Sequence, residues 1–341
     1  MTRVAVLVLV VAAAVRCSAQ PNSELNRYFQ QSVGLNQGQV AAIRGGQAVS
    51  VKLKSRIPDE VFVFGAVFVK ATPEGYVKLA YDFDRMRKVS GFVAVGKFSD
   101  PPRVSDLQGF SFDSDDIKAL KDCKPGNCQI QMPAGGIEAL HQSVDFSAPD
   151  AGDKVDAFQH EKVIERLLAY LKAGNQALGE YNDKKNPTQV PEQFKYMLSY
   201  GKALPQAMPD YYNYLLAYPD GKPANVENMF YWAKVKFGLK PTLRLVHVVT
   251  MRGNSSHEPA YTIAEKQLYS SHYFETALDM TYCIRGDDPN QPGFYLIMVM
   301  GSEQAGLTGF KGSLVRKVAV DKSASSLQKS LMAIKDALEK R

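Results

Sequence analysis

The strongest constraint on the fold is a series of five strand-like segments in the last third of the chain. They cover residues 229–237, 243–252, 261–269, 273–284 and 294–299. Each is rich in β-branched and aromatic residues, and turn-forming pairs such as Gly253-Asn254 and Gly286-Asp287 lie between them. Because short turns join antiparallel neighbours, these segments predict an antiparallel meander.

One long amphipathic helix is expected after the meander. Leu327, Leu331, Ile334 and Leu338 recur at helical spacing and therefore share one face. Such a stripe needs an apolar surface, which the alternating residues of the strands supply. The pattern predicts an α+β fold in which a curved antiparallel sheet receives a long C-terminal helix.

Earlier segments add strands and a helical insertion. Strands are expected at 47–55, 61–70, 91–98 and 129–132, and Thr72-Pro73-Glu74 has the residues that begin a helix. Short helices are expected at 114–121 and 133–142, a long one at 156–181, and two shorter ones at 192–202 and 209–218. We therefore predict a single α+β domain over residues 20–341, with a helical insertion at about 154–222.

The first nineteen residues have the pattern of a secretory signal peptide. Arg3 precedes twelve apolar residues, Val4 to Val15, and Ala19 is a suitable residue for cleavage before Gln20. Lipid attachment at Cys17 is disfavoured by the large Arg16 before it. No later apolar segment reaches the ~18 residues of a membrane-spanning helix. We expect an exported protein, periplasmic or secreted, that does not span a membrane.

The composition excludes several function classes and identifies none. Apolar residues make up 45% and charged residues 22% of the chain, as in ordinary globular proteins. The formal net charge of +6 is small and scattered, which gives no support for nucleic-acid binding. Phosphate-loop, G-x-S-x-G and H-E-x-x-H motifs are missing from the sequence. We expect no cofactor and no metal.

Three cysteines remain after signal cleavage. Cys123 and Cys128 enclose Lys124-Pro125-Gly126-Asn127, whose Pro-Gly pair favours a tight turn. The turn brings the two sulfur atoms close, and an oxidising compartment would join them. A zinc site is the alternative, although no second ligand pair follows at suitable spacing. Cys283 lies in a strand-like segment and is expected to be a buried, inert thiol.

The candidate ligand-binding residues are Lys266, Tyr269, His272 and His247. In an extended segment Lys266 and His272 share a face, with aromatic residues such as Tyr269 beside them. A lysine and a histidine could hold an anionic headgroup, or the histidine could act as a general base. The structural alternative is a solvated Lys266, a locally bonded His272 and a core His247. No catalytic residue is assigned.

The chain resembles an uncharacterised family of exported bacterial proteins. The resemblance rests on the Cys-Lys-Pro-Gly-Asn-Cys turn, on residues 230–232 and 237–241, on His247 and on residues 266–274. It covers most of the mature chain and implies no assigned activity. Gly301-Ser302-Glu303 departs from a more basic pattern at that position.

The order of elements is also similar to the helix-grip fold of START-like lipid-binding proteins. In that fold the sheet curls around the last helix and leaves an apolar cavity, so the resemblance implies a lipid-binding function. We therefore expect a carrier of an apolar or amphipathic molecule, with Lys266 and His272 at the polar end of a cavity beside the C-terminal helix. A structural or interaction protein, and a histidine-dependent hydrolase or isomerase, remain alternatives.

Overall fold

The structure is a computed structural model that describes residues 21–89, 91–200, 208–236, 240–255, 257–304 and 309–340. The predicted signal peptide, residues 1–19 with Cys17, lies outside these residues. Across the described part of the chain, no helix has both the length and the apolar character needed to cross a membrane.

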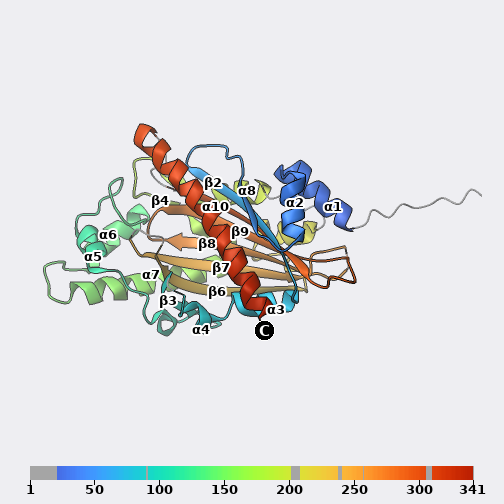
Figure 1. Ribbon diagram of the computed structural model, residues 1–341. Coiled ribbons are helices and arrows are strands. Elements are labelled where there is room, and N and C mark those ends of the chain that lie inside the picture. The colour runs from blue at the N-terminus through green and yellow to red at the C-terminus, as the bar shows by residue number, and fades with distance from the viewer. Residues whose placement is uncertain are drawn as a thin grey trace, which may run out of the picture.

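The centre of the fold is an open antiparallel sheet of eight strands in the order β1-β2-β10-β9-β8-β7-β6-β3 (Figure 1). The early strands are β1 (Val49–Lys52), β2 (Glu60–Val69) and β3 (Phe92–Lys97). The predicted five-stranded meander is confirmed, and each of its strands pairs with the next along the chain. It consists of β6 (Val226–Val235), β7 (Thr242–Arg252), β8 (Tyr261–Ser270), β9 (Phe274–Arg285) and β10 (Phe294–Gln304).

One expected strand does not form. Residues 129–132 have no strand conformation, because their backbone bonds go to distant loops. The amide of Gln131 donates to the carbonyl of Ser271 at 3.0 Å, and the amide of Asn182 donates to the carbonyl of Met132 at 3.0 Å. The four-residue alternation therefore predicted a strand that the structure does not contain.

The predicted C-terminal helix, α10 (Gly309–Glu339), packs on one face of the sheet together with α3 (Pro73–Ala80) and α4 (Phe83–Met86). Leu327 and Leu331 lie against β2 at Gly65, where an added Cβ would stand 2.7 Å from Leu331 Cδ1. Gly65 therefore permits the close approach of helix and strand. Thr72 begins α3 as expected, since its hydroxyl accepts from the Gly75 amide at 3.1 Å.

The other face of the sheet carries the helices between β3 and β6, together with α1 (Pro21–Arg27) and α2 (Gln37–Arg44). The insertion is longer than expected, because β3 pairs directly with β6 and everything between them leaves the sheet. Its helices are α5 (Ser114–Lys121), α6 (Ala134–Ser143), α7 (Ala151–Ala173), α8 (Val190–Tyr200) and α9 (Pro209–Ala217), and β4 (Glu180–Tyr181) pairs with β5 (Thr188–Gln189) beside them.

The helix expected over residues 156–181 is shorter than its apolar pattern suggests. It ends at Ala173 because Gly174 takes a φ of +60°, a conformation that a side chain rarely adopts. A Cβ at Gly174 would also collide with the carbonyl oxygen of Tyr218. The chain therefore turns back toward the sheet at this glycine and brings Asn175 over β8.

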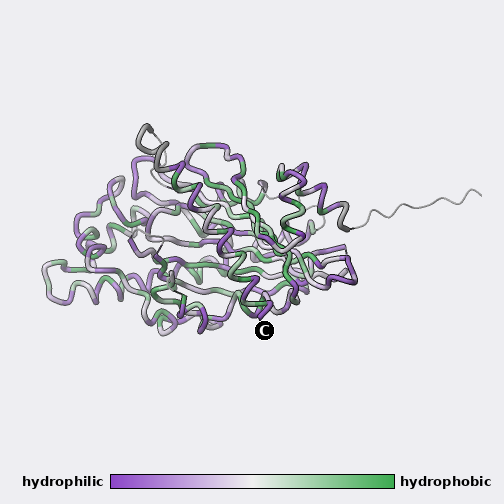
Figure 2. Tube along the Cα trace, viewed as in Figure 1, coloured by the Kyte–Doolittle hydropathy of each residue, from purple (hydrophilic) through white to green (hydrophobic). Residues whose placement is uncertain are grey.

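The sheet separates two hydrophobic cores. Hydrophobic residues gather along its central strands, whereas the outer loops are mainly hydrophilic (Figure 2).

The predicted disulfide joins Cys123 and Cys128, so these sulfurs are not free thiolates for zinc. Cys283 is a fully buried thiol on the α10 side, and burial raises its pKa.

Candidate functional site

Lys266 lies on the face of the sheet that the insertion covers, with 2% of its surface exposed. Its ammonium nitrogen donates to Tyr170 Oη at 3.2 Å and to Asn175 Oδ1. It also stands 3.8 Å from the centre of the Phe194 ring. No carboxylate pairs with it among the residues described, and burial holds its pKa well below the ordinary value.

His247 belongs to the same network. The Tyr170 hydroxyl lies 2.9 Å from His247 Nδ1, and His247 Nε2 lies 2.9 Å from Asn228 Oδ1. The neutral ring with its proton on Nε2 satisfies both contacts, because Tyr170 then donates and Asn228 accepts. Burial, and then the charge of Lys266, lowers the pKa of His247 well below its usual range.

This placement corrects the expected site, since Lys266 and His247 face away from α10. Sequence alternation groups residues by face but does not say which helices cover that face. A register shift opposite Leu245 and Val246 also breaks the alternation within β8. As a result Tyr269 turns to the side of Lys266, where its ring lies 6.4 Å from that of Tyr181.

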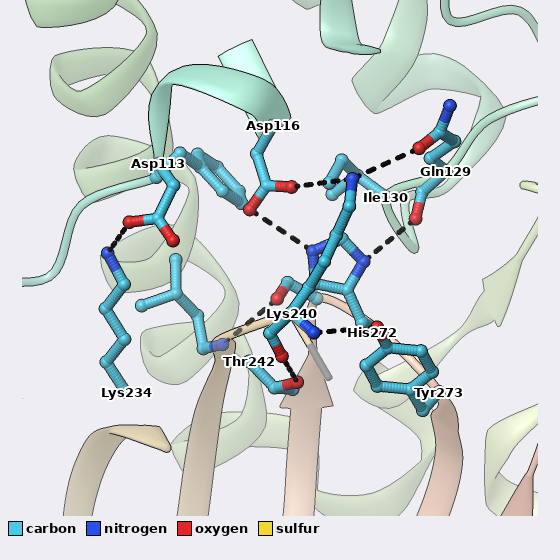
Figure 3. Close-up of polar contacts among 12 residues, drawn as sticks. Asp113, Asp116, Gln129, Ile130, Lys234, Lys240, Thr242, His272 and Tyr273 are labelled. Carbon is cyan, nitrogen blue, oxygen red and sulfur yellow. Dashed lines mark hydrogen bonds and ion pairs between the residues drawn. The ribbon is translucent and has the colours of Figure 1, made fainter. Parts of the chain in front are cut away.

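His272 lies in a separate cluster, in the turn between β8 and β9 (Figure 3). Its Nε2 is 3.2 Å from Asp116 Oδ2, and its Nδ1 is 3.1 Å from the carbonyl oxygen of Gln129. The Lys240 ammonium reaches Asp116 Oδ1 at 3.5 Å and Gln129 Oε1 at 3.2 Å. Lys266 is not part of this cluster.

The geometry of His272 favours a structural role. Both ring nitrogens face oxygen atoms of the protein, Asp116 Oδ2 and the carbonyl oxygen of Gln129. Neither nitrogen is therefore open to a substrate. The cluster joins α5, the segment at Gln129 and the β8–β9 turn, and it fixes the insertion to the end of the sheet.

A polar cluster that the sequence analysis missed lies on the opposite face, beside α10. Glu265 of β8 and Asp279 of β9 are directly paired neighbours in the sheet. Tyr81 Oη donates to Glu265 Oε1 at 2.9 Å, and Tyr231 Oη donates to Glu265 Oε2 at 3.2 Å. We call these four residues the carboxylate pair and its tyrosines.

Desolvation acts on the carboxylate pair and on its tyrosines. Desolvation raises the pKa of Asp279 to about 7, Arg244 acts in the opposite direction, and Glu265 raises it further. Arg244 Nε also donates to Gln267 Oε1 at 3.1 Å. Burial and the nearby carboxylates raise the pKa values of both tyrosines. Arg244 is therefore the base whose charge acts on Asp279.

The two faces of the central strands are covered to different degrees. On the insertion side, the residues of β8 and β9 near the carboxylate pair, such as Ala264, Lys266 and Met280, are buried. On the α10 side, Glu265, Asp279 and several apolar neighbours are only half-buried; these neighbours are Phe83, Met86, Tyr261, Met298 and Met300. Helix α10 makes its closest backbone approach at β1, β2 and α3. Ile263, Val246 and Val248 on this face are nevertheless buried, so the half-buried part is local to the carboxylate pair and the neighbours just named.

The signal for this cluster was present in the sequence. Glu265 follows Tyr261 and Ile263 at every second position, and Asp279 precedes Thr281 and Cys283 in the same way. An acidic residue at an apolar strand position indicates a buried charge. The presence of two such residues on adjacent strands could have indicated the site.

The described residues contain no group of three or more histidine, cysteine, aspartate or glutamate side chains that could hold a metal ion. In comparisons with known proteins, no protein-family model and no curated protein matches this chain.

Proposed function

We propose that this protein is a non-catalytic carrier that holds an apolar or amphipathic molecule between the sheet and α10. The observation that carries the proposal is the carboxylate pair, which is half-buried on the α10 side of the sheet beside the half-buried apolar residues Met298, Met300 and Phe83. Carboxylates that are removed from water are costly unless they are paired, and desolvation is the largest influence on the pKa of Asp279.

The charge of the site favours a ligand with a cationic head, in place of the anionic head that Lys266 suggested. An ammonium group beside Glu265 and Asp279 would balance the second carboxylate. The rings of Tyr81 and Tyr231 offer faces that attract cations. Met298, Met300 and Phe83 supply an apolar surface for a hydrocarbon chain.

Two sequence features support a carrier. The helix-grip-like arrangement of sheet and C-terminal helix resembles START-like lipid-binding proteins, which is an analogy at the level of the fold. The predicted signal peptide agrees with a carrier that acts in the periplasm or after secretion. His272, the candidate general base, has both nitrogens occupied, which disfavours the hydrolase alternative.

The test compares three amphiphiles with the same twelve-carbon chain below their micelle concentrations: a trimethylammonium, an alcohol and a carboxylate. Calorimetric titration of the mature protein should show the order cationic, neutral, anionic. Glu265→Gln should weaken binding of the cationic probe about tenfold, the loss expected for 1.4 kcal/mol, and should spare the alcohol.

The control is Glu165→Gln on the exposed side of α7, which should leave all three affinities unchanged. If none of the three amphiphiles binds, and native mass spectrometry of the purified protein finds no co-purified lipid, the carrier proposal is wrong. Equal binding of the cationic and anionic probes would contradict the assignment of the polar end alone.

A further inference from the structure

Two residues of the central strands hold the part of the insertion that lies nearest to them. In the described part of the chain, every hydrogen bond from α7 or from the short 3-10 helix η3 (Gly174–Leu178) to a strand of the sheet ends on His247 or Lys266. Tyr170 and Asn175 are the partners on the insertion side. Apart from apolar and ring packing, this network is therefore what keeps α7 and η3 on β7 and β8.

The two strand residues are direct neighbours that can both carry a positive charge. His247 of β7 pairs in register with Lys266 of β8, and only 1% and 2% of their surfaces are exposed. The Tyr170 hydroxyl oxygen stands between them, 2.9 Å from His247 Nδ1 and 3.2 Å from Lys266 Nζ. Two charges at this separation repel each other strongly, because both groups are removed from water.

The groups that face His247 are neutral. Phe230 of β6 stacks on the imidazole with ring centres 4.4 Å apart, and the Tyr218 ring that follows α9 lies at 4.6 Å. Asn228 of β6 faces Nε2, and its own Nδ2 donates to the hydroxyl of Tyr214 on α9 at 2.8 Å. Neither β6 nor α9 brings an acidic side chain into contact with the ring among the described residues.

Lys266 likewise meets a hydroxyl, an amide oxygen and the Phe194 ring of α8, and no carboxylate pairs with it among the described residues. Asp100 acts on this region only at its margin, where burial, then Tyr214 and Asp100, raises the pKa of Tyr218. Burial lowers the pKa of Lys266, and no acid acts in the opposite direction. The network therefore has two groups that can become cations and none that can balance them.

A proton added to His247 breaks the link to α7. It has to go to Nδ1, because Nε2 already carries a proton in the neutral form that the contacts select. Nδ1 can then no longer accept from Tyr170, and the proton of that hydroxyl loses its acceptor. The Tyr170 oxygen is left between an imidazolium and the amine of Lys266. The closed network therefore accommodates neutral His247 and not the charged form.

We propose that this network is an acid-sensitive latch, in which protonation of His247 releases α7 and η3 from β7 and β8 while the rest of the sheet stays folded. In the released form both cations reach water, which removes the conflict between them. Histidine is the side chain whose charge ordinarily changes between about pH 5 and 8. The inference does not depend on the carrier function, because the latch and the carboxylate pair share no residue and lie on opposite faces of the sheet.

Hydrogen–deuterium exchange of the full mature chain at pH 7.5 and at pH 5 tests the latch. A single detached helix is marginally stable in water, so amides of α7 and η3 exchange when the latch opens. Released histidine titrates near pH 6.5, so the protection factor of residues 163–178, corrected for the intrinsic effect of pH on exchange, should fall at least about thirtyfold. At pH 5 these amides should be about tenfold or more less protected than residues 60–69 of β2.

Asn228→Asp is the decisive variant, because it changes the side chain little and places a carboxylate beside His247 Nε2 in the closed state. That carboxylate favours the charged ring without opening, so the fall in protection should become at least about tenfold smaller. His247→Gln should have the same effect because the titrating group is gone. His141→Gln, at an exposed position on α6, is the matched control and should keep the wild-type fall.

Two results would overturn the proposal. Equal protection of residues 163–178 and 60–69 at pH 5 would show that the insertion leaves the sheet only when the whole chain unfolds. An undiminished fall in Asn228→Asp would show that the response to acid does not come from His247, and this variant decides the question even where His247→Gln fails to fold.

Discussion

Replacing Tyr170 by phenylalanine tests the network that joins the insertion to the sheet. The substitution removes one oxygen atom from a fully buried ring. That oxygen accepts from Lys266 at 3.2 Å and donates to His247 at 2.9 Å, so two buried titratable groups lose a partner together. Asn175 and the Phe194 ring remain around the Lys266 amine.

The magnitude follows from the number and kind of bonds removed. Two buried hydrogen bonds are lost and one histidine nitrogen is left without a partner, which should destabilise the fold by about 3 kcal/mol. Tyr211→Phe is the matched control, because that ring is equally buried and its hydroxyl donates to the carbonyl of Val249 at 2.8 Å without contacting a titratable group through this bond. This control should cost about 1 kcal/mol.

Urea unfolding followed by tryptophan fluorescence measures both values. Trp232, the single tryptophan of the chain, is buried on the insertion side of β6, and its indole donates to the carbonyl of Asp106 in the insertion. Its emission therefore reports separation of insertion and sheet. Equal losses in Tyr170→Phe and Tyr211→Phe would refute the argument that the network contributes more than an ordinary buried hydrogen bond.

Four further predictions concern His247, Gly65, the predicted signal peptide and the cysteines. Burial lowers the pKa of His247 below 6.5 in the folded state, so the unfolded state binds the proton at a higher pH. The free energy of unfolding should therefore fall by about 1.4 kcal/mol per pH unit from this group as the pH drops below 6.5. His247→Gln should remove this contribution to the pH dependence of the free energy of unfolding in urea titrations. Gly65→Ala should destabilise by about 1–3 kcal/mol, since the new methyl group overlaps Leu327 and Leu331, and an unchanged melting temperature would contradict that packing. N-terminal sequencing of the exported protein should begin at Gln20, and an intact Met1 would disprove signal cleavage. Thiol titration of the denatured, unreduced protein should find one free thiol, that of Cys283.

The sheet and the C-terminal helix were predictable because their signals are local. Residues 226–304 alternate in polarity and are divided by turn residues, so each strand is specified within its own segment. Leu327 and Leu331 likewise belong to an apolar stripe on one helix face, and such a stripe packs against an apolar surface. The disulfide follows from a six-residue turn, which is also local.

The candidate sites depended on contacts that no local pattern specifies. Lys266 meets Tyr170 and Asn175 of the insertion, and His272 meets Asp116, all far away in the sequence. Periodicity grouped Lys266 and His272 on one strand face, but the register shift in β8 breaks that alternation, and periodicity does not show which helices cover a face.

The pairing of β2 with β10 sets the order in which the molecule can be completed. All ten residues of β2 are buried, yet the longer of its two partner strands is β10, the last strand in the described part of the chain. Phe68 of β2, for example, pairs with Tyr295 of β10. Until β10 is available, β2 presents an apolar strand with an unpaired edge, which is prone to pair with other chains. Completion of the sheet is therefore a late and non-local event, and slow folding is the expected consequence. A ribosome or export channel that still holds β10 would keep the chain from its native state. A chaperone that shields β2 during this interval would raise the yield of folded protein.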